Sequence, residues 1–143
     1  MKIRVLLVDD EKDFIDVLAE RLEARDFITS KAYSGDEAMG LVREREVDVV
    51  LLDVQMPSKD GVAVLREIKA FNPLVEVIML TGHSTVESAV EGMKIGAFDY
   101  LLKPTETKDL VEKLVLAYKR KSEQETRIRQ AEIERILSRK GWA

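Results

Sequence analysis

Three short runs of almost continuous aliphatic residues constrain the fold of this chain more than any other feature. They are Val5-Leu6-Leu7-Val8, Val49-Val50-Leu51-Leu52 and Val77-Ile78-Met79-Leu80. A strand with one face in water alternates apolar and polar residues, whereas a parallel strand covered on both faces is apolar throughout. We therefore predict that these runs are the central strands of a parallel sheet with helices on both faces.

Segments of helical periodicity separate five predicted strands, which we expect at residues 3–8, 27–33, 47–52, 75–80 and 99–102. Capping boxes at Ser34-x-x-Glu37 and Ser84-x-x-Glu87 predict where the second and fourth helices begin. The predicted inward faces of the first, third and fifth helices are Phe14, Val17, Leu18 and Leu22; Val62, Leu65 and Ile68; and Leu110, Leu114 and Ala117. Strict alternation of strand and helix predicts a doubly wound α/β fold.

The bulk composition excludes several classes of protein. With 143 residues, 45% of them hydrophobic, the chain suits one compact domain and a short appendage. The absence of cysteine excludes disulfides and thiolate metal sites. No apolar run reaches the roughly 20 residues of a membrane-spanning helix, and the start of the chain does not resemble a signal peptide. We therefore expect a cytoplasmic protein without membrane contact, and the net charge of −4 argues against direct nucleic-acid binding by the domain itself.

Chemically reactive side chains stand where the predicted strands end. The four ends read Asp9-Asp10-Glu11, Asp53, Thr81-Gly82 and Lys103-Pro104. Doubly wound sheets bind ligands at the carboxyl ends of their strands. We therefore expect these side chains to meet at one edge of the sheet.

Such a group of residues predicts a site that binds Mg²⁺ and a phosphoryl group. Clustered carboxylates repel one another and lose hydration when partly buried, and a hard divalent cation relieves both costs. Mg²⁺ suits the cluster because it takes oxygen ligands, keeps several waters and needs few carboxylates. Thr81 offers a hydroxyl and Lys103 a positive charge for phosphoryl oxygens, while Asp53 is a candidate nucleophile.

Several motifs in order resemble the response regulator receiver domain of bacterial two-component systems, and NtrC-type receivers in particular. The matching segments are Val8-Asp9-Asp10-Glu11, Leu51-Leu52-Asp53-Val54-Gln55-Met56-Pro57 with Gly61, Leu80-Thr81-Gly82 and Gly96-Ala97-Phe98-Asp99-Tyr100-Leu101-Leu102-Lys103-Pro104. The resemblance covers residues 1–119 and implies the flavodoxin-like (βα)₅ fold with strand order 2-1-3-4-5. Residues 120–143 would then be a helical extension or linker.

The resemblance also implies a role for each matching residue. Asp53 would accept a phosphoryl group from a sensor histidine kinase or a phosphotransfer protein, with Thr81 and Lys103 contacting that group. Mg²⁺ would be bound by Asp10, Asp53 and the backbone carbonyl of Gln55, with Asp9 acting through a water.

Switching is the last role that the resemblance implies. Tyr100 would turn inward after Thr81 moves. The surface of the fourth helix, fifth strand and fifth helix would then control partner binding or homodimer formation.

Other residues near the motifs have simpler interpretations. His83 is the single histidine of the chain and is expected in an exposed loop, where it could affect water access to a phosphorylated aspartate. Pro57 and Gly61 are expected to shape the loop after Asp53. Tyr100 is also consistent with an ordinary aromatic residue at a sheet edge.

The C-terminal end has its own charge and pattern. Residues 119–140 carry eight basic and four acidic side chains, so this segment is +4 and the rest of the chain −8. No glycine or proline occurs from Thr105 to Lys140, so the fifth helix is predicted to continue for up to about 50 Å. Its i,i+4 pairs Glu123–Arg127 and Glu125–Arg129 favour a solvated helix. The sequence is consistent with a coiled coil, with docking of Ile133, Ile136 and Leu137, with a standalone regulator and with a fragment of a larger NtrC-type regulator.

Three other functions remain open on the sequence alone. A haloacid-dehalogenase-type phosphatase also uses an aspartate nucleophile and Mg²⁺, but it needs Asp-x-Asp after the first strand. A flavin carrier of the same fold needs a neutral phosphate loop where this chain has Asp9-Asp10-Glu11. A helical oligomerisation module would leave Asp53 without a chemical role.

Overall fold

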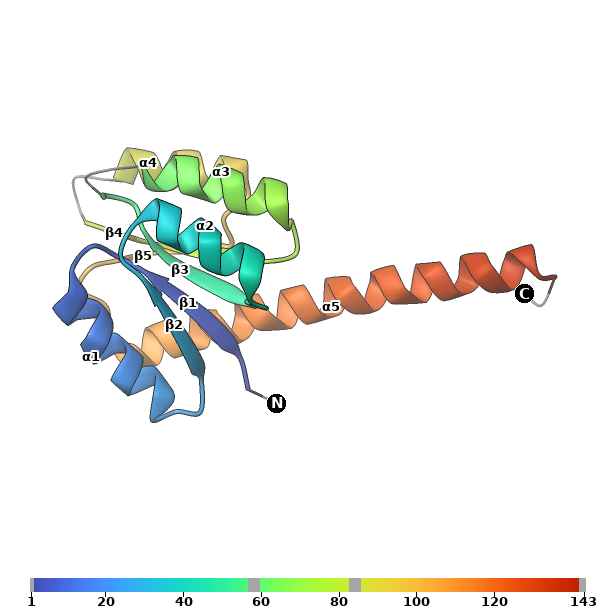
Figure 1. Cartoon of the computed structure of the whole chain (residues 1–143), viewed down its shortest axis with the longest axis horizontal. Coiled ribbons are helices and arrows are strands. Elements are labelled where there is room, and N and C mark those ends of the chain that lie inside the picture. The colour runs from blue at the N-terminus through green and yellow to red at the C-terminus, as the bar shows by residue number, and fades with distance from the viewer. Residues whose placement is uncertain (1, 57–59, 83–85, 142–143) are drawn as a thin grey trace.

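The chain forms one five-stranded sheet and five helices in residues 2–56, 60–82 and 86–141, the ranges that this computed structural model describes (Figure 1). The strands are β1 (Arg4–Val8), β2 (Ile28–Ala32), β3 (Val49–Asp53), β4 (Glu76–Thr81) and β5 (Asp99–Leu102). The helices are α1 (Lys12–Glu23), α2 (Gly35–Glu44), α3 (Gly61–Phe71), α4 (Val86–Ile95) and α5 (Thr107–Arg139). Pro57, His83 and Ser84 lie outside the described residues, so the expectations for them rest on the sequence alone.

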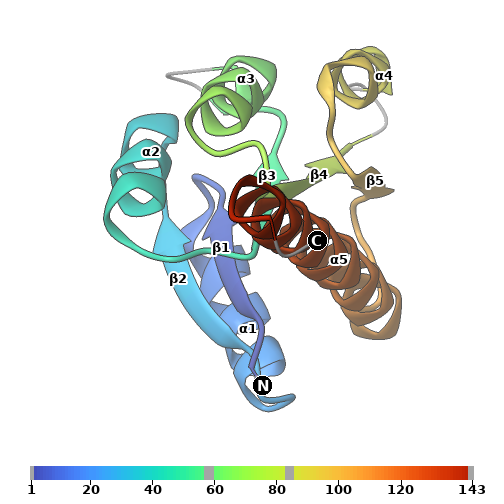
Figure 2. The ribbon, with the colours of Figure 1, turned by 90° about the vertical axis from the view of Figure 1, so that its right-hand side faces the viewer.

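The strands are all parallel and are hydrogen-bonded in the order β2-β1-β3-β4-β5. Helices α1 and α5 cover one face of the sheet, and α2, α3 and α4 cover the other (Figure 2). Each predicted strand is present, with bounds that differ by no more than two residues. The predicted doubly wound α/β fold and its strand order are confirmed.

Burial on both faces explains the continuous apolar runs. Every residue of β3 and of β4 is buried. Successive side chains of a strand point to opposite faces, and accordingly Leu52 packs beneath α2 and α3 whereas Leu51 packs against the α1 and α5 side. An alternating strand would leave one of these two cores without apolar side chains.

The predicted start of α2 is confirmed in detail. The Ser34 hydroxyl accepts a hydrogen bond from the Glu37 backbone N–H at 3.2 Å. The Glu37 carboxylate in turn accepts from the Tyr33 backbone N–H at 2.7 Å, one residue before the position that a standard capping box uses. The first bond satisfies a backbone donor that the first turn of a helix leaves without a partner, and the second ties the residue before the N-cap to the helix.

The inward face of α1 differs from the predicted one. Leu18 and Leu22 are buried as expected, but Ile15 and Ala19 complete the buried stripe and Val17 is 47% exposed. The predicted and the observed apolar stripes of α1 share Leu18 and Leu22. On the observed stripe, the small side chain of Ala19 lets the helix lie close to the sheet. The predicted inward residues of α3 and α5 are all buried.

Helix α5 runs without a break for 33 residues, about 50 Å, and extends beyond the sheet (Figure 1). It crosses the predicted domain boundary after residue 119, which stays a prediction. Two buried carboxylates hold the helix just past that point. Lys121 Nζ lies 3.1 Å from Asp48 Oδ1, and the Arg120 guanidinium binds both oxygens of Glu76.

These anchors lie where β3 and β4 begin. Asp48 immediately precedes β3 and Glu76 is the first residue of β4, and each is only 1% exposed. Arg4 also binds Asp48, with Nη2 3.2 Å from Oδ1, and together with Lys121 it holds the pKa of Asp48 below its usual value although burial opposes this. A buried charge without partners would be strongly destabilising, so these pairs explain why the sheet tolerates carboxylates here.

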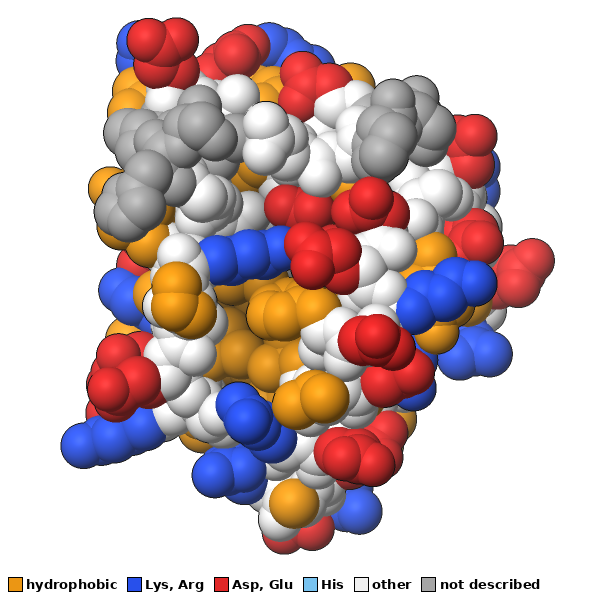
Figure 3. Space-filling view, turned by 90° about the vertical axis from the view of Figure 1, so that its left-hand side faces the viewer, with side chains coloured by type: hydrophobic (Ala, Val, Ile, Leu, Met, Phe, Trp, Pro, Cys, Tyr) orange, Lys and Arg blue, Asp and Glu red, His pale blue; other side chains and the backbone are white. Residues whose placement is uncertain are grey.

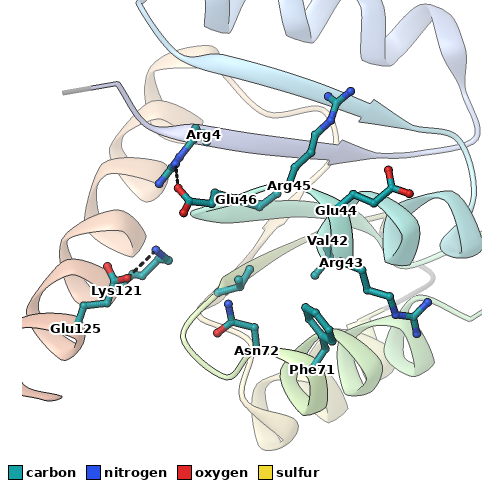
Figure 4. A pocket seen from close by; sticks show the side chains of 12 residues that line it. Arg4, Val42, Arg43, Glu44, Arg45, Glu46, Phe71, Asn72, Lys121 and Glu125 are labelled. Carbon is teal, nitrogen blue, oxygen red and sulfur yellow. Dashed lines mark hydrogen bonds and ion pairs between the residues drawn. The ribbon is translucent and has the colours of Figure 1, made fainter. Parts of the chain in front are cut away.

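A cleft of about 380 Å³ lies beside the anchors, at the edge of the sheet opposite to the carboxyl ends of the strands (Figure 4). Two ion pairs lie among the residues that line it, Arg4 with Glu46 and Lys121 with Glu125. Glu125 therefore pairs one turn back along α5 with Lys121, at 3.3 Å, instead of forward with Arg129 as predicted. Among the described helices, none is both long and apolar enough to cross a membrane.

We expect Lys121→Met to lower the free energy of unfolding by about 1–3 kcal/mol, because Asp48 loses one of its two cationic partners in a buried position. The matched variant Lys119→Met removes an exposed lysine two residues away and should change stability by less than about 0.5 kcal/mol. Urea denaturation measures both values. Equal effects of the two substitutions would contradict the anchoring role of Lys121.

Candidate functional site

Four strands bring the predicted site residues to one edge of the sheet. Asp9 follows β1, Asp53 ends β3, Thr81 ends β4 and Lys103 follows β5. Figure 3 shows this edge, where acidic side chains gather beside a basic one above an apolar hollow. The register places Asp53 opposite Leu80, one residue before Thr81. The side chains meet because parallel strands end at the same side.

Three carboxylates form a compact cluster at this edge. Asp9, Asp10 and Asp53 each offer one carboxylate oxygen, and these atoms all lie within 4.8 Å of one another. Asp9 and Asp53 are buried, whereas Asp10 is exposed and leaves one side open to water. Mg²⁺ binds oxygen ligands at about 2.0–2.1 Å and retains several waters, so a cluster of this size and donor type fits it.

Burial and repulsion disturb the ionisation of Asp53. Its side chain is only 8% exposed. Loss of hydration and the neighbouring Asp9 charge raise the pKa of Asp53 to about 6, although Lys103 and the Gln55 N–H oppose the shift. A cation bound between the carboxylates would relieve both causes.

Lys103 stands between two of the carboxylates. Its Nζ lies 2.7 Å from Asp9 Oδ2 and 3.7 Å from Asp53 Oδ1. Burial alone would lower the pKa of Lys103, but the hydrogen bond to Asp9 and the charge of Asp53 raise it. The Lys103 backbone N–H also donates to the Thr81 carbonyl at 2.8 Å, which continues the pairing of β5 with β4 beyond the strand end.

The roles of Thr81, Gln55 and Tyr100 stay predictions. Thr81 is 1% exposed, and its hydroxyl donates to the Gly82 carbonyl at 2.9 Å. Gln55 donates its backbone N–H to Asp53 Oδ1 at 3.2 Å, while metal binding by its carbonyl stays a prediction. Tyr100 is 38% exposed on β5, and its inward turn likewise stays a prediction.

Gly61 explains how the segment after Asp53 is held. The Gly61 N–H donates to the Val54 carbonyl at 3.1 Å. A Cβ at this position would lie 2.7 Å from Val54 Cα and 2.8 Å from the Asp53 carbonyl oxygen, closer than any side chain tolerates. The absence of a side chain therefore allows α3 to begin directly against the backbone that carries Asp53.

Phe14 is a neighbour of the site that sequence reasoning assigned only to helix packing. The Lys103 Nζ lies over its ring, 4.6 Å from the ring centre. Nothing in the sequence indicates this contact, because it joins the first turn of α1 to the segment after β5. The contact between Phe14 and Lys103 can be recognised only in the folded structure, where the two segments meet.

Comparison with known proteins agrees with this fold. The family model described as response regulator receiver domain matches residues 5–115. The transcriptional regulatory protein ZraR of Salmonella typhimurium is 44% identical over 113 residues, which are 79% of this chain and 26% of that protein. The chain therefore spans about a quarter of the length of this curated relative.

Solved structures show the same likeness. A response regulator receiver domain protein from Clostridium thermocellum is 36% identical, with a TM-score of 0.81 over 84% of this chain and 97% of that one. The receiver domain of NtrX from Brucella abortus is 34% identical, with a TM-score of 0.76 over 80% and 98% of the two chains. The family match covers well over half of the residues, and the chain belongs to the response regulator receiver domain family.

Proposed function

We propose that this receiver accepts a phosphoryl group on Asp53 from the phosphohistidine of a sensor histidine kinase or a phosphotransfer protein. Mg²⁺ would be held by Asp10, Asp53 and the backbone carbonyl of Gln55, with Asp9 acting through a water. The observation that carries the proposal is the meeting of three carboxylates with Lys103 at one edge of the sheet. Each of these groups serves the alignment and charge neutralisation that phosphoryl transfer needs.

The chemistry assigns a task to each side chain. A carboxylate oxygen of Asp53 attacks phosphorus as the bond to the histidine nitrogen breaks, and that nitrogen leaves with the bonding electron pair. Lys103 places positive charge 3.7 Å from Asp53, where charge accumulates on the phosphoryl oxygens. Thr81 ends the neighbouring strand and offers a hydroxyl to the same group. A bound Mg²⁺ would supply further positive charge at those oxygens.

The proposed consequence of phosphorylation is a shift between two arrangements of the surface formed by α4, β5 and α5. A phosphoryl group adds nearly two negative charges and offers new partners to Lys103 and Thr81. Reversing a 1:99 equilibrium requires about 5.5 kcal/mol of differential stabilisation. Tyr100 lies on β5 within this surface, which we propose as the site of partner binding or homodimer formation, with α5 as an alternative dimer contact.

A second candidate is that the chain acts as the receiver part of a larger transcriptional regulator. The named relative ZraR is a transcriptional regulatory protein, of which the matched segment is 26%. A structure of NtrX from Brucella abortus aligns with 92% of this chain but only 30% of its own length, at 33% identity and a TM-score of 0.74. Helix α5 would then connect the receiver to a following domain. We propose the cytoplasm as its location in either case.

We expect acetyl phosphate with Mg²⁺ to add the mass of one phosphoryl group to the protein, and to add none when the metal is chelated. Asp53→Asn should abolish the addition, because the amide has no nucleophilic carboxylate oxygen. Intact-protein mass spectrometry measures both. Labelling that persists in folded Asp53→Asn would move the acceptor to another residue, and sustained turnover of a phosphomonoester would favour the phosphatase alternative.

We expect Asp53→Asn to stabilise the metal-free protein at neutral pH. Because the pKa of Asp53 is raised to about 6 in the folded protein, from 3.8, the folded state binds the proton more tightly than the unfolded state. This contribution to stability is complete below the unfolded pKa and is lost as pH rises to about 6. Above that pH, Asn should gain on the order of 2 kcal/mol in the free energy of unfolding.

Urea denaturation with a chelator, at about pH 4 and about pH 8, measures this difference and its sign. The two proteins should be nearly equal at the lower pH. Asp10→Asn is the matched control, and it should gain less because Asp10 is exposed. A loss of stability in Asp53→Asn at the higher pH would show that the cluster is not electrostatically strained. Saturating Mg²⁺ should favour the wild type, because it binds only the folded state.

A further inference from the structure

We propose that Phe14 is a positioning residue for phosphoryl transfer, and that its ring holds the ammonium group of Lys103 in place beside Asp53. The inference rests on the proposed phosphorylation of Asp53. It adds to that proposal a residue on α1 whose side chain bears no group that could react with or bind phosphate.

The geometry places the ammonium group between carboxylates and an aromatic face. Lys103 Nζ is 2.7 Å from Asp9 and 3.7 Å from Asp53, and its distance to the centre of the Phe14 ring is 4.6 Å. The separation is within the range of about 6 Å for attraction between a cation and an aromatic ring. Phe14 is half-buried and packs against the apolar core beneath α1 and α5, so the ring has a fixed support.

A ring suits this task better than a polar neighbour would. Its face attracts the cation but has no lone pair that accepts a strong hydrogen bond, so the N–H groups of Lys103 remain available to oxygen acceptors. The ring also excludes water from one side of the ammonium group, which strengthens its attraction to the nearby negative charges. A carboxylate at this position would instead compete with the phosphoryl oxygens for Lys103.

The contact between Phe14 and Lys103 matters most when Asp9 takes part in cation binding. The closest partner of Lys103 is Asp9, which is also a member of the proposed cation site. Once Asp9 contributes to cation binding, Lys103 loses part of that attraction and needs another contact to stay near Asp53. Phe14 provides a contact that does not depend on the ionisation or ligation of any carboxylate.

The test compares Phe14→Leu with Phe14→Tyr in the full chain. We expect Phe14→Leu to slow labelling by acetyl phosphate roughly 2- to 30-fold, the range that a cation–ring attraction of known strength implies. Phe14→Tyr keeps the ring face and should restore the rate to within about twofold of the wild type. Val17→Ala, one turn further along α1 on an exposed side chain, is the control for general loss of helix packing.

Two further measurements separate positioning from simple structural damage. Because the Phe14 ring offers no oxygen ligand to a metal ion, Mg²⁺ affinity in Phe14→Leu should stay within about twofold of the wild type while the rate falls. After reductive ¹³C-methylation of lysines, the Lys103 signal, assigned by its loss in Lys103→Arg, should be shifted upfield by the ring in the wild type and in Phe14→Tyr. The shift should disappear in Phe14→Leu.

The failures of the two proposals are distinguishable. Wild type that takes up no phosphoryl group overturns the proposed function. Wild type that is labelled while Phe14→Leu reacts equally fast overturns the role of Phe14 alone. A Lys103 signal that is the same in Phe14→Leu as in the wild type, or Mg²⁺ affinity that falls in step with the rate, overturns it as well.

Discussion

Repulsion among carboxylates at the ends of parallel strands governs the electrostatics of the candidate site. Asp9, Asp10 and Asp53 present oxygens within 4.8 Å of one another, and two of these side chains are buried. The parallel sheet imposes this arrangement, because β1 and β3 are hydrogen-bonded neighbours that end at the same edge. Lys103 offsets part of the repulsion, but burial and the charge of Asp9 still raise the pKa of Asp53 to about 6. A cation bound among these carboxylates would relieve the repulsion.

The opposite edge of the sheet uses buried charge in a different way. There Asp48 and Glu76 are paired with Lys121 and Arg120 of α5, and Asp48 also binds Arg4. Strands β3 and β4 thus run from an anchored carboxylate at their start to Asp53 and Thr81 at their end. These short, fully buried strands connect the candidate site to the part of α5 that leaves the domain. Strain at the acidic edge is tolerated because packing and paired charges stabilise the remainder of the sheet.

Sequence reasoning was most successful where local pattern and tertiary structure coincide. The aliphatic runs at Val5–Val8 and Val77–Leu80 predicted buried strands, and the order of strands and helices predicted the topology. It was least successful where several residues could meet a requirement equally well. The buried stripe of α1 was shifted because Ile15 and Val17 are both plausible inward residues, and only the contact with the sheet decides between them. The burial of Lys121 could not be predicted from local pattern, since its partner Asp48 is distant in sequence. The contact of Phe14 with Lys103 was missed for the same reason.

The most direct test of this account is a crystal structure of the protein with Mg²⁺ and beryllofluoride, which mimics a phosphoryl group. We expect Mg²⁺ among Asp9, Asp10 and Asp53, beryllium bonded to an Asp53 oxygen, and Lys103 Nζ within hydrogen-bonding distance of fluoride while still over the Phe14 ring. Beryllofluoride on a different residue, or a metal ion bound away from these carboxylates while Asp53 stays unmodified, would contradict it.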